Sequence, residues 1–343
     1  SDDASFGNVL IQRKHAVAEV DGVSYPSVKL AFDSITSSEN KTIKLLKTLP
    51  TIVNLGESTK DVTLDSNRNA VRYFGNSTYL VNKNKFNVYD SNDSKGNCIY
   101  SKGATIIDNY GSVNYDKSMT LSNPSITAVI NHENSEFTLN GSIERDNEVY
   151  YYAIDNLGTF IINDAIIKGR IENLNGNINI TNSNIYSNSD ISINNDSGEI
   201  NIFGGEIYNN EINGKAIYNK SGKITIVNSD INATKDKSIG ISNSGNLVVE
   251  SGNITGTYNG ILNNSELTIN DGTISSYGRN GKALEIDNAN SITNMYGGII
   301  TTSDMPNSTA IYSKSGITNI YSGDVYANGT NNTAIYIGYS GSV

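Results

Sequence analysis

The sequence contains no tryptophan, one cysteine and two histidines. Because Cys98 is the only thiol, the chain cannot form an internal disulfide, and cysteine usage does not identify a compartment. One cysteine together with His15 and His132 cannot supply the cluster of nitrogen and sulfur ligands that a zinc site needs. We therefore predict no metal site, and we expect Cys98 to be a small buried or half-buried residue.

Basic residues are also scarce, with 25 Lys and Arg against 35 Asp and Glu and a formal net charge of −10. No cluster of Lys or Arg forms a stripe, so binding to nucleic acid or to an anionic membrane is disfavoured. No run of about 18 apolar residues occurs, so no membrane insertion is expected. The glycine patterns of phosphate-binding and dinucleotide-binding loops are missing, and we predict no cofactor.

What the sequence does contain is a repeat, seen most clearly in residues 216–231. The tetrapeptide Ala216-Ile217-Tyr218-Asn219 opens this unit, and an apolar alternation and a polar turn follow. Close copies recur at intervals of 17 to 24 residues, and looser copies follow them. The close copies open at Ala153, Arg170, Ser192, Gly240 and Gly260, and the looser ones at Ala283, Ala310 and Ala334. A repeat of this length is typical of solenoids, propellers or arrays.

Each unit holds three short β segments and leaves no room for a helix. Apolar residues alternate in these segments, as Ile224 and Ile226 do, which is the period of a strand. One turn of such a chain cannot bury both faces of its own strands, so its neighbours must cover it. The repeat therefore predicts a parallel β-helix, since a propeller blade needs roughly 40 residues and antiparallel hairpins.

The common phase of the repeat also predicts which side chains point inward. If the Ile of the tetrapeptide is buried, the Asn two residues later is buried too, and stacked Asn side chains can form a ladder of hydrogen bonds. The predicted inward residues are Ile154, Ile171, Ile193, Ile217, Ile241 and Ile261, with a ladder at Asn195, Asn219 and Asn243 and with Asn173 and Asn263 at the same repeat position.

These units resemble the right-handed parallel β-helix of the pectin-lyase-like superfamily, in the enzyme-free form found in cell-surface proteins and adhesins of Gram-positive bacteria. The resemblance covers the chain from about Val17 to the end. It implies a bacterial protein that is secreted or associated with the cell wall. The catalytic motifs of the superfamily do not match, because neither histidine lies between glycines and Arg170-Ile171-Glu172 only faintly resembles the Arg-Ile-Lys of its hydrolases.

We predict a tail in residues 1–15 and one β-helix domain in residues 16–343. Its expected parts are an N-terminal cap and first strand in 16–52, irregular coils in 53–127 and regular coils in 128–343, which we expect to continue beyond the last residue. Residues 123–125 and 144–148 are predicted to be projecting loops.

The predicted cap contains a short helix. Val28, Ala31, Phe32 and Ile35 would share one helix face, and Pro26 would lie at the start of the helix, where its missing N–H costs least. Such an amphipathic helix can cover the open end of the first coil.

No catalytic residue is predicted, and the candidate ligand contacts are outward tyrosines and two carboxylates: Tyr186, Tyr208, Tyr218, Tyr312, Tyr336, Asp155 and Glu172. A tyrosine combines a flat apolar face with a hydroxyl, which suits sugar or protein partners. Stacking between coils that only stabilises the sheet explains these tyrosines equally well. Asp155 and Glu172 should share one outward column, where paired acids could catalyse or hold a cation, although a solvated face is favoured.

The sequence therefore favours a non-enzymatic, surface-exposed β-helix module that adheres to a host or bacterial surface glycan or protein and is monomeric. The first alternative is a polysaccharide lyase or glycoside hydrolase acting in the groove of the β-helix, with carboxylates supplied by the irregular loops of residues 53–148. The second alternative is a phage tail receptor-binding protein, which would be a trimer.

Overall fold

The protein is an all-β parallel β-solenoid of about 12 turns with one short helix near its N-terminus, as the sequence predicts. The structure, a computed structural model, describes residues 15–36, 39–93, 97–117, 119–122, 126–144 and 152–343. Some predicted segments lie outside the described residues. They are the predicted tail apart from His15, and the predicted loops at 123–125 and 144–148 apart from Glu144. The side chain of Cys98 also lies outside the described residues. The right-handed sense of the coil stays a prediction.

The chain divides into two compact units, and each is described by itself. The N-terminal unit comprises Ser1–Ile154 and Gly158–Ile161, and the C-terminal unit comprises Asp155–Leu157 and Ile162–Val343. The prediction of a single domain over residues 16–343 stays a prediction.

The strands up to the boundary of the units are short. They are β1 (Ala18–Val20), β2 (Val23–Tyr25), β3 (Lys41–Leu45), β4 (Leu49–Thr51), β5 (Gly56–Ser58), β6 (Val62–Asp65), β7 (Val71–Tyr73), β8 (Leu80–Asn82), β9 (Lys85–Tyr89), β10 (Asn97–Ser101), β11 (Ile107–Asn109), β12 (Ser112–Tyr115), β13 (Met119–Ser122), β14 (Val129–Asn131), β15 (Glu136–Leu139), β16 (Ser142–Glu144), β17 (Tyr152–Asn156) and β18 (Thr159–Asn163).

The strands of the C-terminal unit are longer on average, and several contain two segments of the repeat. They are β19 (Ile166–Lys168), β20 (Arg170–Asn173), β21 (Asn177–Ser187), β22 (Ile191–Asn195), β23 (Glu199–Asn209), β24 (Lys215–Asn219), β25 (Lys223–Val227), β26 (Ser229–Ala233), β27 (Ile239–Asn243), β28 (Asn246–Val249), β29 (Gly252–Gly256), β30 (Asn259–Asn263), β31 (Glu266–Ile269), β32 (Thr273–Ser276), β33 (Lys282–Ile286), β34 (Ile292–Met295), β35 (Ile299–Thr302), β36 (Thr309–Ile320), β37 (Asp324–Ala327) and β38 (Thr333–Ser342).

The N-terminal unit begins with the predicted cap. Helix α2 (Val28–Ser34) packs on β1, β2 and β3, and the Ser27 side chain caps it by accepting a hydrogen bond from the Leu30 N–H at 3.1 Å. Phe32 is buried on the inner face of the helix, and Ile35 is buried just after its last turn. Pro26 precedes the N-cap, so it lies outside the helix that it was predicted to begin.

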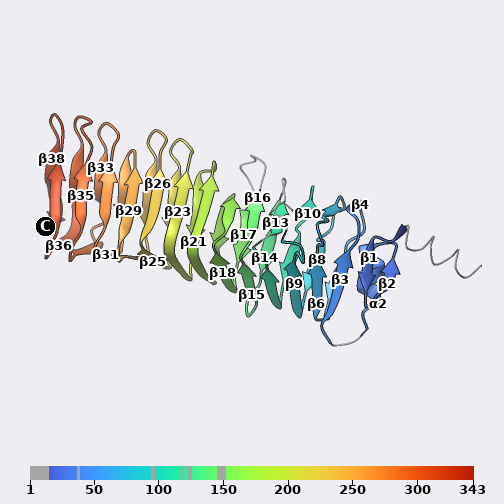
Figure 1. Cartoon of the computed structure of the whole chain (residues 1–343). Coiled ribbons are helices and arrows are strands. Elements are labelled where there is room, and N and C mark those ends of the chain that lie inside the picture. Colours follow the sequence, from blue (N-terminus) through green and yellow to red (C-terminus); the bar gives the residue numbers. More distant parts are fainter. Residues whose placement is uncertain (1–14, 37–38, 94–96, 118, 123–125, 145–151) are drawn as a thin grey trace, which may run out of the picture. The chain divides into compact units, whose positions relative to one another are not determined.

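Parallel pairing between successive coils begins where β3 meets β6. In the C-terminal unit each coil contributes to three strand columns, and corresponding strands of neighbouring coils lie side by side (Figure 1). The column formed by β20, β22, β24, β27, β30 and β33, and by the first parts of β36 and β38, is called here the first-strand column.

The predicted inward isoleucines form the core. Ile154 of the N-terminal unit is fully buried, and so are the five predicted isoleucines of the C-terminal unit, at positions 171, 193, 217, 241 and 261. Full burial of a side chain of this size contributes roughly 1.5–3 kcal/mol. The repeated phase of the tetrapeptide thus places one such contribution in every coil.

The asparagine ladder is also confirmed. Each buried Asn donates a side-chain hydrogen bond to the Asn of the next coil, with N···O distances of 2.8 to 3.0 Å from Asn156 through Asn173, Asn195, Asn219 and Asn243 to Asn263. Asn263 then donates to the Thr293 hydroxyl, because the next residue in the register is Ile286. Pairing along the axis allows these amides to be buried at low cost.

The N-terminal unit has a ladder of its own, which the sequence analysis missed. Asn82 donates to Asn109 and Asn109 to Asn131, each at 2.8 Å. The coils predicted to be irregular therefore contain the same inward Asn as the regular ones.

A glycine beside the ladder is required by its close packing. The Gly222 carbonyl accepts a hydrogen bond from the Asn219 side chain at 3.0 Å. A Cβ at Gly222 would lie 2.3 Å from the Asn195 amide nitrogen and 2.3 Å from the Gly198 carbonyl oxygen. The turn that follows the first strand thus has no room for a side chain at this position.

Over the described residues, the structure holds no helix with the length and apolar character that a membrane-spanning helix needs.

Candidate ligand-binding face

The residue that precedes the ladder Asn points outward, and the register places these residues in one line across the first-strand column. This outer column consists of Glu172, Asn194, Tyr218, Ser242, Leu262, Glu285, Tyr312 and Tyr336. Asp155 belongs beside Glu172, because β17 pairs with β20 and their ladder residues Asn156 and Asn173 are bonded. Three of the predicted outward tyrosines, Tyr218, Tyr312 and Tyr336, thus lie in this one column.

Part of the outer column is buried, so the predicted solvated face is wrong for Glu172. This residue is only 5% exposed. The Asn194 amide donates to one of its carboxylate oxygens at 2.5 Å, and the Arg170 guanidinium lies 3.9 Å from the other. Arg170 also pairs with Asp190 at 2.6 Å. Neighbouring side chains thus replace water around the Glu172 carboxylate, which alternation within one strand could not predict.

A second polar cluster lies further along the outer column. The Lys282 ammonium is 2.5 Å from one Glu285 carboxylate oxygen, and the Asn259 amide donates to the other at 2.8 Å. The same ammonium lies over the rings of Tyr258 and Tyr312, at 5.3 and 4.3 Å from their centroids. The cluster joins three coils.

Burial lowers the pKa of Lys282, but the hydrogen bond and the charge of Glu285 outweigh burial and raise the pKa above its ordinary value of 10.5. Lys282 is therefore charged at neutral pH, and it holds the Glu285 carboxylate in place. The sequence analysis missed this cluster because Asn259 and Glu285 are 26 residues apart.

Four of the predicted outward tyrosines form two ring contacts between coils. Tyr312 and Tyr336 stack with centroids 4.7 Å apart and planes 6° apart, whereas Tyr186 and Tyr208 meet edge to face at 6.2 Å. The Tyr208 hydroxyl accepts a hydrogen bond from the Thr234 hydroxyl at 3.0 Å. Burial is the main cause that raises the pKa of Tyr186, and the negative charge of Glu206 raises it further. Tyr186 and Tyr208 are half-buried, whereas Tyr336 is exposed, so the second pair is the better candidate for ligand contact.

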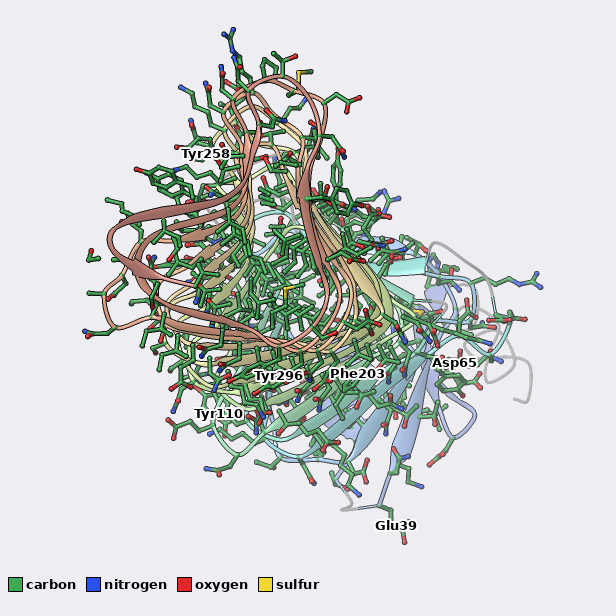
Figure 2. The ribbon with its side chains drawn as sticks, turned by 90° about the vertical axis from the view of Figure 1, so that its left-hand side faces the viewer. Glu39, Asp65, Tyr110, Phe203, Tyr258 and Tyr296 are labelled. Atoms are coloured by element: carbon green, nitrogen blue, oxygen red, sulfur yellow. The ribbon has the colours of Figure 1, made fainter. Side chains whose placement is uncertain are left out.

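Several aromatic contacts escaped the sequence analysis, among them Tyr296 with Tyr321 and Tyr110 with His132. Tyr296 and Tyr321 stack at 4.8 Å and are 51% and 63% exposed. They follow the second segment of the repeat, and Figure 2 shows Tyr296 on a different side of the coil from Tyr258. In the N-terminal unit, His132 stacks on Tyr110 at 3.8 Å and bonds Asp108 at 2.6 Å. Each contact joins neighbouring coils, so only the register reveals it.

The turns that precede the first strands form a row of projecting loops, called here the loop edge, at the top of the C-terminal unit in Figure 1. From one coil to the next they span residues 210–214, 234–238, 257–258, 277–281, 303–308 and 328–332. Loops are where binding residues concentrate, because their polar groups are satisfied by water and their sequence can vary.

No three side chains of His, Cys, Asp or Glu come together as metal ligands would among the residues described. Comparisons of the chain with protein-family models, with curated proteins and with solved structures gave no match, so the resemblance to the pectin-lyase-like superfamily stays a prediction.

Proposed function

We propose that this protein is a non-enzymatic, surface-exposed binding module that holds an extended glycan along its outer column. The observation that carries the proposal is the fixed interval of the polar groups. The stacked rings of Tyr312 and Tyr336 are 4.7 Å apart, and Glu285 precedes them in the same column. A polymer with a regular repeat of hydroxyls can bond to several such groups in register, so modest contacts combine.

The hydrogen bonds of the two carboxylates support a binding role rather than a catalytic one. Glu172 accepts from Asn194, and Glu285 is held by Lys282 and Asn259. An acid or base catalyst must be able to reach a substrate proton, and these oxygens already bond to side chains. Both carboxylates are buried, so contact with a ligand falls to the tyrosines of the column, of which Tyr336 is exposed.

The resemblance to β-helices of the pectin-lyase-like superfamily suggests where such a module would act. We propose a secreted or cell-wall-associated bacterial protein of Gram-positive origin, with a glycan of a host or bacterial surface as its partner. The protein would act as a monomer, since one solenoid carries the whole outer column.

A panel of surface glycans and plant polysaccharides tests the proposal through the double variant Tyr312→Ala/Tyr336→Ala. Its binding should fall about tenfold or more, because aromatic anchors dominate such contacts. The matched control is Tyr296→Ala/Tyr321→Ala, which removes a stacked and more exposed pair from another side of the coil. Equal losses in the two variants, or no binding by the unaltered protein to any glycan, would contradict the proposal.

A polysaccharide lyase or glycoside hydrolase is the second candidate, since Asp155, Glu172 and Arg170 lie together at one end of the outer column. It predicts release of unsaturated or reducing-end products, and that release should be abolished by Asp155→Asn or Glu172→Gln. A trimer in solution would instead favour a phage tail receptor-binding protein.

A further inference from the structure

The loop edge is interrupted by one short turn. Residues 257–258 join β29 to β30, whereas the turns on either side, 234–238 and 277–281, are each five residues long. In Figure 1 the loop after β29 is lower than its neighbours. The result is a notch of about 550 Å³ between the two longer loops, which is within the usual range of small-molecule sites.

The notch has a fixed floor. The Ser238 N–H donates to the Thr257 hydroxyl at 2.9 Å, and the Lys282 N–H donates to the Tyr258 carbonyl at 2.6 Å. The wall formed by the later loop is also fixed, because the Gly278 N–H donates to the Thr257 carbonyl at 2.9 Å. A Cβ at Gly278 would lie 2.2 Å from that carbonyl oxygen, so this wall touches the floor directly. A site held in this way needs little rearrangement on binding.

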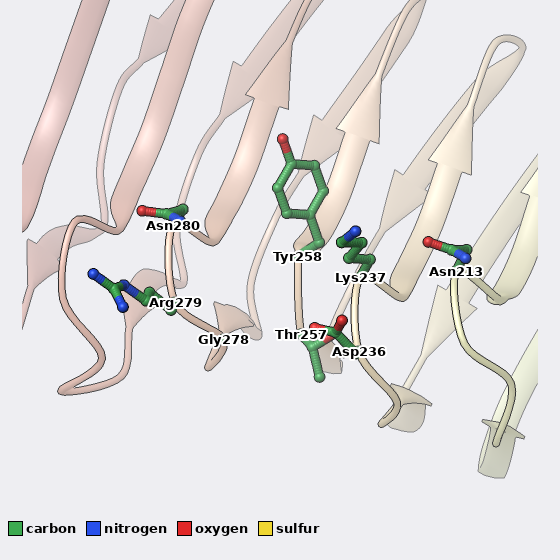
Figure 3. Close-up of a pocket in the computed structure, with 8 residues that line it drawn as sticks. All are labelled: Asn213, Asp236, Lys237, Thr257, Tyr258, Gly278, Arg279 and Asn280. Carbon is green, nitrogen blue, oxygen red and sulfur yellow. The ribbon is translucent and has the colours of Figure 1, made fainter.

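Tyr258 stands upright in the notch and is 37% exposed (Figure 3). The Lys282 ammonium lies over one face of the Tyr258 ring, 5.3 Å from the ring centroid. In the part of the chain that the structure describes, no aromatic ring stacks on Tyr258, in contrast to Tyr312 and Tyr336. Lys237 of the preceding loop lies beside the ring (Figure 3).

The charges around the notch are of one predominant sign. Several basic side chains of the C-terminal unit pair with a carboxylate, as Lys220 does with Asp196 and Lys314 with Asp287. Those that line the notch differ: Lys237 and Arg279 form no ion pair with any described residue, and both are exposed. The acidic side chain that lines the notch is Asp236, near Thr257 (Figure 3). Among the lining residues, two cations against one anion attract an anionic ligand to a chain whose net charge is −10.

We propose that the notch binds a terminal sugar that carries an anionic group, with the anion at Lys237 and the sugar ring against the exposed part of Tyr258. The loops on both sides block a polymer from running through the notch along the axis, so the ligand is a chain end or a branch. Asn213 and Asn280 line the same notch and can bond to sugar hydroxyls. Arg279 extends away from Tyr258 (Figure 3). It would therefore attract the anionic group mainly through the electrostatic field of its positive charge.

Because the ligand is a glycan, this proposal rests on the proposed function. It differs in the site, since the notch lies at the loop edge and recognises one sugar, whereas the outer column holds an extended chain. The two are therefore tested with different probes and different variants.

The probes are sialyllactose, lactose and sulfated lactose, titrated against the full chain by NMR. We expect the acidic sugars to bind and lactose to bind at least about tenfold more weakly, as expected for a lost charge-assisted hydrogen bond. The two acidic probes differ in their anion, so their ranking shows whether a carboxylate or a sulfate is recognised. Lactose that binds as well as both acidic probes would overturn the proposal.

Four variants locate the site. Lys237→Gln should weaken binding of the acidic probe about tenfold, and Arg279→Gln should weaken it less. Lys314→Gln removes the same charge away from the notch and should leave affinity unchanged. Asp236→Asn should strengthen binding of the acidic probe, because it removes a negative charge from the notch. A misfolded variant would bind the probe more weakly, so misfolding cannot explain a gain in affinity. Equal effects of Lys237→Gln and Lys314→Gln would contradict binding at the notch, and they would not bear on the outer column. If only the Tyr312→Ala/Tyr336→Ala test fails, the outer column is contradicted as the glycan site and the notch is not.

Discussion

The two turns that flank the first strand of each coil differ sharply within the C-terminal unit. The turn after the strand, called here the ladder edge, begins at a buried Asn that ends the strand. This Asn bonds to the Asn of the neighbouring coils, as Asn195, Asn219 and Asn243 show. The turn before it, the loop edge, ranges from residues 257–258 to residues 303–308 in length. One strand thus separates a constant edge from a variable one.

The difference teaches where this fold keeps stability and where it can place function. A buried amide without a partner costs about 1–3 kcal/mol, so each coil must supply an Asn that fits the coils on both sides of it. Backbone groups in an exposed loop bond to water instead, so loop length and charge can change with little cost. The notch at Tyr258 is a product of that freedom.

The largest effect is expected at the core position that supports both edges. Ile217→Asp buries a charge without a partner between Ile193 and Ile241, and it should destabilise the protein by more than about 4 kcal/mol. Chemical denaturation measures the loss. The control Ile217→Val should cost only about 0.5–1.5 kcal/mol, and a mild effect of the Asp substitution would disprove the inward assignment.

The ladder edge should be the next most sensitive. Asn219→Ala removes the acceptor of Asn195 and the donor to Asn243, and each group left alone should cost about 1–3 kcal/mol. The exposed Asn253 provides the control, and its replacement by Ala should change stability by less than about 0.5 kcal/mol. Thermal unfolding of the two variants compares them directly, and similar melting temperatures would refute a stabilising role for the ladder.

The ion pair between the two edges should have an intermediate effect. Lys282→Met leaves Glu285, which is 8% exposed, without its cation and should cost about 1–2 kcal/mol after allowance for solvent screening. Because folding raises the pKa of Lys282, its contribution is complete below pH 10.5 and is lost at higher pH. The stability difference between the two proteins should therefore shrink as the pH rises above that value. A difference that grew with pH would contradict the pairing.

The smallest effect on stability is expected at the loop edge. Doubling the length of the loop 234–238 with Gly and Ser should cost only about 0.6 kcal/mol. The same insertion beside Gly222, where a Cβ would already lie 2.3 Å from the Asn195 amide nitrogen, should be far more damaging. The denaturation midpoints of the two insertion variants are compared. Equal losses of stability would mean that both edges are equally constrained, which would contradict the prediction.

Much of the fold could be predicted from local patterns. The inward Ile and Asn of the tetrapeptide sit two residues apart, and every predicted Ile is buried. The ladder residues Asn82, Asn109 and Asn131 obey the same rule, with Leu80, Ile107 and Val129 two residues before them. They were missed because the tetrapeptide was aligned on its first residue, which varies, and because their coils differ in length.

The candidate site was harder to predict, because its contacts join different coils. Glu172 was assigned correctly to the outer column but wrongly to solvent, since Asn194 and Arg170 surround its carboxylate. Glu285 accepts a hydrogen bond from Asn259 of the preceding coil as well as pairing with Lys282. The ligand roles assigned to Tyr186, Tyr208 and Asp155 remain predictions.

The sequence by itself determined the strands, the inward phase of Ile and Asn and the stacking of coils, because alternation and repetition are local properties that each unit carries whole. Only the tertiary structure decided which outward residues meet, which carboxylates lose their water and where a loop is missing from its row. Those properties depend on the register between coils, and the register is set by the summed lengths of turns that the repeat leaves free to vary.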